Sequence, residues 1–160
     1  MKKRNFKIAK SDEERHIVMG WANVSARADG TLVEDLQHDV IEPEELERAV
    51  YDYVLEFRDA GEEHDPSMRK KGRLVESVVF TEDKLKAMGI PDETVPYGWW
   101  VGFKIDDDDT WNRVKDGSYS MFSIEGTAVR VRSDLKKART FSEVYFKTKM
   151  NSGRRFRTRT

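Results

Sequence analysis

The fold is decided by one stretch of nine residues, Tyr97-Gly98-Trp99-Trp100-Val101-Gly102-Phe103-Lys104-Ile105. Large apolar side chains occupy every second position of this stretch, from Tyr97 to Ile105. In an extended chain, side chains two positions apart lie on the same face. The stretch therefore predicts a strand with one buried face, and a sheet around it.

Four more stretches predict strands. HIVMGWANV at residues 16–24 and LVESVVF at residues 74–80 are rich in apolar and β-branched residues, which favour strands. Residues 118–132 and 140–149 are two later candidates. Because strands outnumber helices in this reading, we expect a mainly antiparallel sheet or barrel.

One main helix is expected to begin at Pro43, because proline is favoured in the first helical turn and acids follow it directly. Gly61 is placed to end this helix. Its apolar face would be formed by Leu46, Val50, Tyr53, Val54 and Phe57. Short helices are expected at residues 81–88, closed by Gly89, and at 109–116, with Asp109 as N-cap and Gly117 just past the end. The predicted fold class is α+β: a mainly antiparallel β-barrel flanked by one main helix and short helices.

Composition limits the function classes. The chain has 160 residues, 37% charged and 38% hydrophobic, and its 4 Trp, 5 Tyr and 8 Phe are too many for a disordered chain. No apolar run approaches the roughly 18–20 residues that span a bilayer, so we expect no membrane partner. The absence of cysteine excludes disulfides, thiol catalysis and cysteine-based zinc sites.

Charge is divided between two blocks. Residues 130–160 carry 11 Lys and Arg against 2 acids, whereas residues 1–129 carry 18 against 28. We therefore expect a protein domain at 1–149 and a basic C-terminal tail at 150–160, which either solubilises the chain or binds an acidic partner. The acidic body argues against nucleic-acid binding except through the tail.

Histidine and serine are the candidate catalytic groups. The chain has three histidines, His16, His38 and His64, and the ordinary pKa of histidine lets it act as a base near neutral pH. His64 lies in an acidic segment just after the main helix; a surface loop histidine is the simpler interpretation. With cysteine absent, serine is the leading nucleophile, apart from threonine or lysine.

Ser118, Ser120 and Ser123 lie in one predicted strand, and serines on alternating faces of a strand need no catalytic explanation. Alternation places Ser123 with Tyr119, Met121, Val129 and Val131, so it is expected to be partly buried. A buried hydroxyl needs a hydrogen-bond partner, and a histidine is one candidate.

Carboxylates supply two further candidates. Glu76 alternates with Leu74, Val78 and Phe80, so it is either a buried acid that needs a partner or, if the other face of the strand is buried, an exposed one. Glu125 and Glu143 lie near the same predicted sheet. The aspartates at 106–109 lack the spaced ligands and turn glycine of a calcium loop, so they are interpreted as an acidic helix N-terminus.

A resemblance rests on an ordered series of segments over roughly residues 16–130: Gly20-Trp21-Ala22-Asn23-Val24, Asp39-Val40-Ile41-Glu42-Pro43, the His64 segment, Val75-Glu76-Ser77, the strand Tyr97–Ile105, Trp111-Asn112-Arg113-Val114-Lys115-Asp116-Gly117 and Phe122-Ser123-Ile124-Glu125-Gly126. Together they resemble the XkdF-like phage serine proteases, a branch of the phage prohead proteases. The resemblance implies an assemblin-like fold and makes residues 1–149 a protease-like domain, with Ser123 as nucleophile, His64 as base and no cofactor. For the third catalytic group it leaves Glu76, our choice, and Glu143, its rival.

The resemblance also implies the partners. Substrates would be the scaffolding protein and the major capsid protein, cleaved inside the assembling prohead in the host bacterial cytoplasm, with self-cleavage and a homo-oligomer as further expectations. Two alternatives stay open: a non-enzymatic phage structural or scaffold-associated module on the same fold, and a nucleic-acid-binding domain that uses the basic tail.

Overall fold

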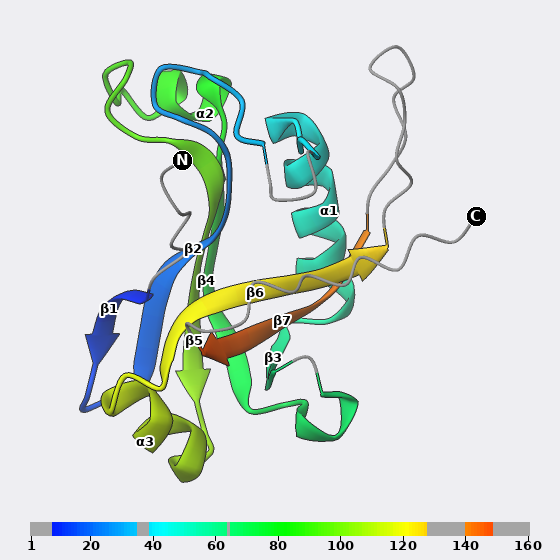
Figure 1. Ribbon diagram of the computed structural model, residues 1–160. Helices are drawn as coiled ribbons and strands as arrows, with labels where there is room; N and C mark the ends of the chain where they lie inside the picture. Colours follow the sequence, from blue (N-terminus) through cyan, green and yellow to red (C-terminus); the bar gives the residue numbers. More distant parts are fainter. Residues whose placement is uncertain (1–7, 35–38, 64, 128–139, 149–160) are drawn as a thin grey trace.

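The computed structural model describes residues 8–34, 39–63, 65–127 and 140–148. Figure 1 shows their arrangement. The strands are β1 (Ile8–Asp12), β2 (Ile17–Ala26), β3 (Asp59–Glu62), β4 (Gly72–Phe80), β5 (Tyr97–Ile105), β6 (Tyr119–Thr127) and β7 (Thr140–Thr148). The helices are α1 (Pro43–Glu56), α2 (Glu82–Ala87) and α3 (Asp108–Lys115), with a short 3-10 turn, η1 (Pro66–Met68).

The strands form one sheet in the order β1-β2-β5-β4-β3-β7-β6. The five strands from β1 to β3 are antiparallel to their neighbours, β7 joins β3 in parallel, and β6 returns antiparallel to β7. The α+β class and the mainly antiparallel sheet are therefore confirmed. The closed barrel is wrong: the hydrogen-bonded order has two ends, β1 and β6, although β6 lies against β2 and β1.

The core lies between β5, α1 and β6. The alternation of β5 is confirmed, because Trp99, Val101, Phe103 and Ile105 are all 0% exposed. Tyr53 of α1 meets Trp99 edge-on at 5.2 Å between ring centroids, and the indole Nε1 of Trp99 donates to Ser77 Oγ at 2.9 Å. Each large apolar side chain buried in this way contributes roughly 1.5–3 kcal/mol.

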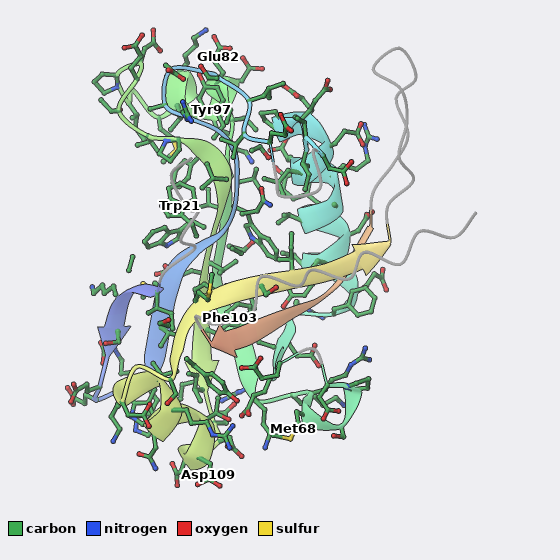
Figure 2. All side chains as sticks on the ribbon, in the orientation of Figure 1. Trp21, Met68, Glu82, Tyr97, Phe103 and Asp109 are labelled. Atoms are coloured by element: carbon green, nitrogen blue, oxygen red, sulfur yellow. The ribbon has the colours of Figure 1, made fainter. Side chains whose placement is uncertain are left out.

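Strand β6 crosses the sheet (Figure 1) and packs on the same face of β5 as α1, further along the strand. Phe122 of β6 packs on Phe103 at 5.9 Å between ring centroids. Figure 2 shows Phe103 pointing inward, whereas Trp21 lies on the outer face of the sheet, in contact with Trp100 and Phe80. Along the described stretches, no helix has both the length and the apolar character needed to cross a membrane.

Two predicted helix boundaries are wrong. Helix α1 ends at Glu56, and Arg58, with φ of 63°, takes the left-handed turn that was expected of Gly61; Gly61 lies in β3 instead. Helix α3 is capped by Asp107 rather than Asp109, because the Asp107 side chain accepts from the backbone N of Thr110. The acidic helix N-terminus is confirmed, two residues earlier than expected.

Gly98 lies where two backbones approach closely. A Cβ atom there would come within 2.4 Å of the Asn23 carbonyl oxygen, whereas at Gly102 its nearest neighbour would be the side-chain Cβ of Glu76 at 3.1 Å. Backbone of a central strand pair gives way less easily than a side chain.

We therefore expect Gly98→Ala to lower the free energy of unfolding by about 1–3 kcal/mol, the usual range for overpacking. Urea unfolding of this variant beside Gly102→Ala measures the difference. Equal losses in the two variants would show that the β2–β5 contact does not depend on this glycine.

Candidate active site

Ser123 lies in the middle of β6, on the face opposite the core. Its neighbours Phe122 and Ile124 are buried in the core, 0% and 6% exposed, so alternation directs Ser123 to the other side. Ser123 is itself only 9% exposed, which confirms its predicted burial. The prediction that Tyr119 shares the face of Ser123 is wrong. A register shift between Tyr119 and Met121 places Tyr119 on the core face with Phe122.

The strand registers place Ser123 level with the end of β3. Ser123 pairs with Tyr145 of β7, and Tyr145 pairs with Gly61 of β3. One strand lies between them, so β3 and β6 are about 10 Å apart at this level by the ordinary spacing of strands. The chain then turns after Glu62, whose carbonyl oxygen accepts from the backbone N of Asp65 at 2.9 Å.

His64 lies outside the described residues, so its assignment as base stays a prediction. In the sequence it falls between Glu62 and Asp65, the two ends of that turn. The turn is fixed on its far side, because the Asp65 side chain accepts from the backbone N of Ser67 at 2.8 Å and caps η1. His38 also lies outside the described residues, and His16 stacks on Trp111 at 4.6 Å between ring centroids.

Glu76 is exposed on the outer face of β4, opposite Gly102, so of its two interpretations the structure shows the exposed one. Because β4 pairs antiparallel with β3, Glu76 lies past the start of β3, in the direction away from Glu62. Glu143 pairs with Glu125, two positions along from the Ser123–Tyr145 pair. The registers thus bring Glu143, and not Glu76, near the level of Ser123.

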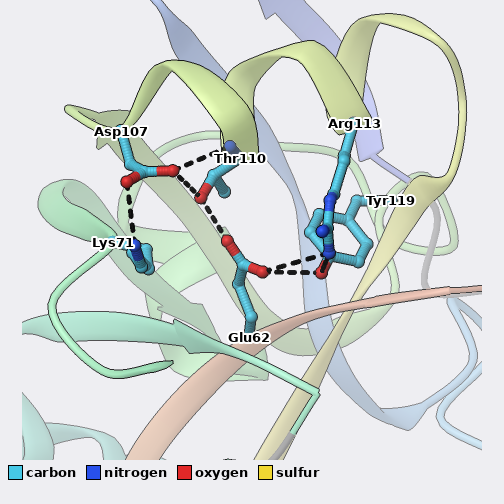
Figure 3. A network of polar contacts seen from close by, with 6 residues as sticks. All are labelled: Glu62, Lys71, Asp107, Thr110, Arg113 and Tyr119. Carbon is cyan, nitrogen blue, oxygen red and sulfur yellow. Dashed lines mark hydrogen bonds and ion pairs between the residues drawn. The ribbon is translucent and has the colours of Figure 1, made fainter. Parts of the chain in front are cut away.

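A buried carboxylate lies beside this turn (Figure 3). Glu62, 2% exposed, accepts a hydrogen bond from the Tyr119 hydroxyl at 2.7 Å and another from the Thr110 hydroxyl. Arg113 Nη1 lies 3.5 Å from Glu62 Oε2 and donates to the Tyr119 hydroxyl at 2.7 Å. The contacts join β3, α3 and β6, so Glu62 holds these three elements together.

The same network continues to the N-terminus of α3. The Thr110 hydroxyl lies 2.8 Å from Asp107 Oδ1, and Lys71 Nζ donates to Asp107 Oδ2 at 2.8 Å. The hydrogen bond from Lys71, followed by that from the backbone N of Thr110, lowers the pKa of Asp107 to about 2. Burial, followed by the hydrogen bond to Glu62, raises the pKa of Tyr119 to about 12. Two carboxylates and two cations therefore balance within one network.

Sequence reasoning missed Glu62. The main helix was expected to run to Gly61, so β3 was not predicted and the alternation that buries Glu62 could not be read. The available signal was the acid two residues before His64, which was treated as part of an acidic loop. As for metals, the described ranges contain no cluster of three or more acidic or histidine side chains that could hold an ion.

These observations describe an α+β protein in which a serine, Ser123, lies on a strand. Ser123 is level with the end of β3, where the buried carboxylate of Glu62 begins a turn. A family model with the description "Putative phage serine protease XkdF" matches residues 5–132 of the 160-residue chain. The chain belongs to this family of phage proteins, as the resemblance implied. The matched range includes Ser123, His64 and Glu62. Comparison with curated proteins finds no match, and neither does comparison with solved structures.

The raised pKa of Tyr119 makes folding depend on pH in the alkaline range. In the unfolded chain a tyrosine loses its proton near pH 10, whereas in the fold Tyr119 keeps it to about pH 12. The stability gained from this difference is complete below pH 10 and is lost as the pH rises towards 12.

We therefore expect the wild type to lose more unfolding free energy between pH 9 and pH 11.5 than Tyr119→Phe loses, as measured by urea titration. Tyr51→Phe is the matched control, because Tyr51 is 48% exposed. Identical pH dependence of all three proteins would contradict the assigned pKa of Tyr119.

Proposed function

We propose that this chain is a serine endopeptidase that cleaves the scaffolding protein and the major capsid protein of a phage during head assembly. The family supports the phage serine-protease class. The observation that carries the proposal for this chain is the register that sets Ser123 level with Gly61, the residue just before the turn from Glu62 to Asp65, which contains His64 in the sequence.

The proposed reaction is acyl transfer. His64 takes the proton of the Ser123 hydroxyl as its oxygen attacks the substrate carbonyl carbon, and then gives this proton to the leaving amine. A water molecule, deprotonated by the same imidazole, releases the acyl group from Ser123 and restores the free enzyme. Backbone N–H donors would stabilise the oxyanion, at about 3–4 kcal/mol for a strong donor. Residues 130–137, proposed for this role, lie outside the described residues.

A third group would orient the imidazole. Glu76 was the choice from sequence, but its exposure and the strand register favour Glu143. The proposed setting is the interior of an assembling prohead in the host bacterial cytoplasm. There a high local concentration of scaffold and capsid protein would present the cleavage sites, and the protease itself is a third substrate. A homo-oligomer is part of the same proposal.

A second candidate function is a non-enzymatic module of the phage head on the same fold. The observation that favours it is the low exposure of Ser123, 9%, because a nucleophile must reach a peptide carbonyl. The two candidates differ in whether the serine is needed for cleavage.

We expect co-expression with the scaffolding protein of the same phage to yield scaffold fragments with the wild type and not with Ser123→Ala or His64→Ala. Removal of either group should lower the cleavage rate at least about a thousandfold. Ser118→Ala is the matched control, because Ser118 is exposed five residues earlier in the chain. The same fragments from wild type and Ser123→Ala, or intact scaffold with every variant, would reject the protease and leave the structural module.

A further inference from the structure

Glu62 is a carboxylate at a buried position, where a charged group is energetically unfavourable. Its side chain is 3% exposed, and removing a carboxylate from water costs several kcal/mol unless hydrogen bonds and opposite charge compensate. The compensation here takes three partners, Thr110, Tyr119 and Arg113, none of them on the same strand. An apolar residue at this position would need no polar partners. We therefore look for a role of the Glu62 carboxylate beyond packing.

The partners of Glu62 lie on the strand that carries Ser123 and on the helix that precedes this strand. Thr110 and Arg113 belong to α3, and Tyr119 is the first residue of β6, four residues before Ser123. Tyr119 donates its hydroxyl proton to Glu62 and accepts from Arg113, which fixes the phenol on both sides. The start of the serine strand is therefore tied to the carboxylate of Glu62 (Figure 3).

Glu62 also begins the turn within which the proposed base falls in the sequence. Its backbone carbonyl accepts from the N of Asp65, and Glu63 within the turn has φ of 48°, a left-handed conformation unusual for a non-glycine residue. Such a turn persists where its surroundings hold it. The side chain of Glu62 holds one end and the Asp65 cap of η1 holds the other.

We infer that Glu62 is a positioning residue, whose buried carboxylate fixes the turn from Glu62 to Asp65 against the start of the Ser123 strand. The inference rests on the proposed function for its catalytic consequence, because it assigns to Glu62 the alignment of His64 with Ser123. Glu62 itself does not touch the reacting atoms. Misplacement of a catalytic group by about 1 Å costs roughly a hundredfold in rate, so a fixed turn has a measurable effect.

The test uses Glu62→Gln, which keeps the shape and removes the charge, and Tyr119→Phe, which removes one donor to that charge. Glu82→Gln is the matched control, since the Glu82 side chain is 59% exposed and forms an ion pair with Lys86 on the surface. Two quantities are measured on the full chain: hydrogen exchange of the Asp65 amide relative to amides of α1, and kcat and KM for scaffold cleavage.

We expect Glu62→Gln and Tyr119→Phe to speed exchange of the Asp65 amide at least about tenfold while α1 amides keep wild-type rates. We expect kcat to fall about 10- to 100-fold with KM within about twofold, because the loss is in alignment rather than binding. Glu82→Gln should match the wild type in both measurements.

The two proposals fail in different ways. Unchanged exchange at Asp65 in both variants overturns the positioning role even if the wild type cleaves scaffold. Faster exchange with unchanged kcat also overturns it, because the turn would then be held for stability alone. A wild type that cleaves nothing, while Glu62→Gln still loosens the turn, removes the proposed protease and with it the catalytic role of Glu62, but leaves the contact between turn and strand.

Discussion

The rest of the structure depends on the parallel pairing of β3 with β7. Strand β3 is four residues long. Its pairing with β7 joins the antiparallel strands β1, β2, β5 and β4 to the β6–β7 pair. This pairing sets β7, and with it β6, in register with the rest of the sheet, and so fixes the relation of Ser123 to Gly61. Three backbone pairs are a small contact for this task. The buried contacts of Glu62 reinforce it from the side, by tying the last residue of β3 to α3 and β6.

Burial of charge is what makes this reinforcement specific. Four charged groups, Glu62, Asp107, Lys71 and Arg113, are connected through the hydroxyls of Thr110 and Tyr119. Hydrogen bonds to charged groups are stronger and more directional than apolar contacts, so the network favours one relative placement of its elements. An apolar cluster of the same volume would tolerate small shifts of β3 along β7. A site that needs a strand and a turn in fixed relative positions does not tolerate such shifts.

The parts of the fold that follow from local periodicity could be predicted from the sequence. The strand Tyr97–Ile105 was predicted with its correct bounds because every second residue is large and apolar, and α1 was predicted to begin at Pro43.

The parts of the fold that are set by tertiary contacts could not be predicted from the sequence. Strand β3 reads Asp-Ala-Gly-Glu, which carries no strand signal, and β1 was missed for the same reason. The register shift at the start of β6 turned Tyr119 to the core, and a shift between Leu74 and Glu76 interrupts the alternation on which the interpretation of Glu76 relied. Ser123 came from the resemblance and from alternation together, whereas the burial of Glu62 depends on partners 48 to 57 positions away.

The central claim is that the hydroxyl of Ser123 is activated by the imidazole of His64. The most direct measurement is labelling with a fluorophosphonate, which reacts with activated serines, followed by mass spectrometry of the modified peptides. The account predicts one modified residue, Ser123, in the wild type, and a loss of at least about a hundredfold in labelling rate in His64→Ala. A label on another residue, or labelling of Ser123 at the same rate without His64, would contradict it.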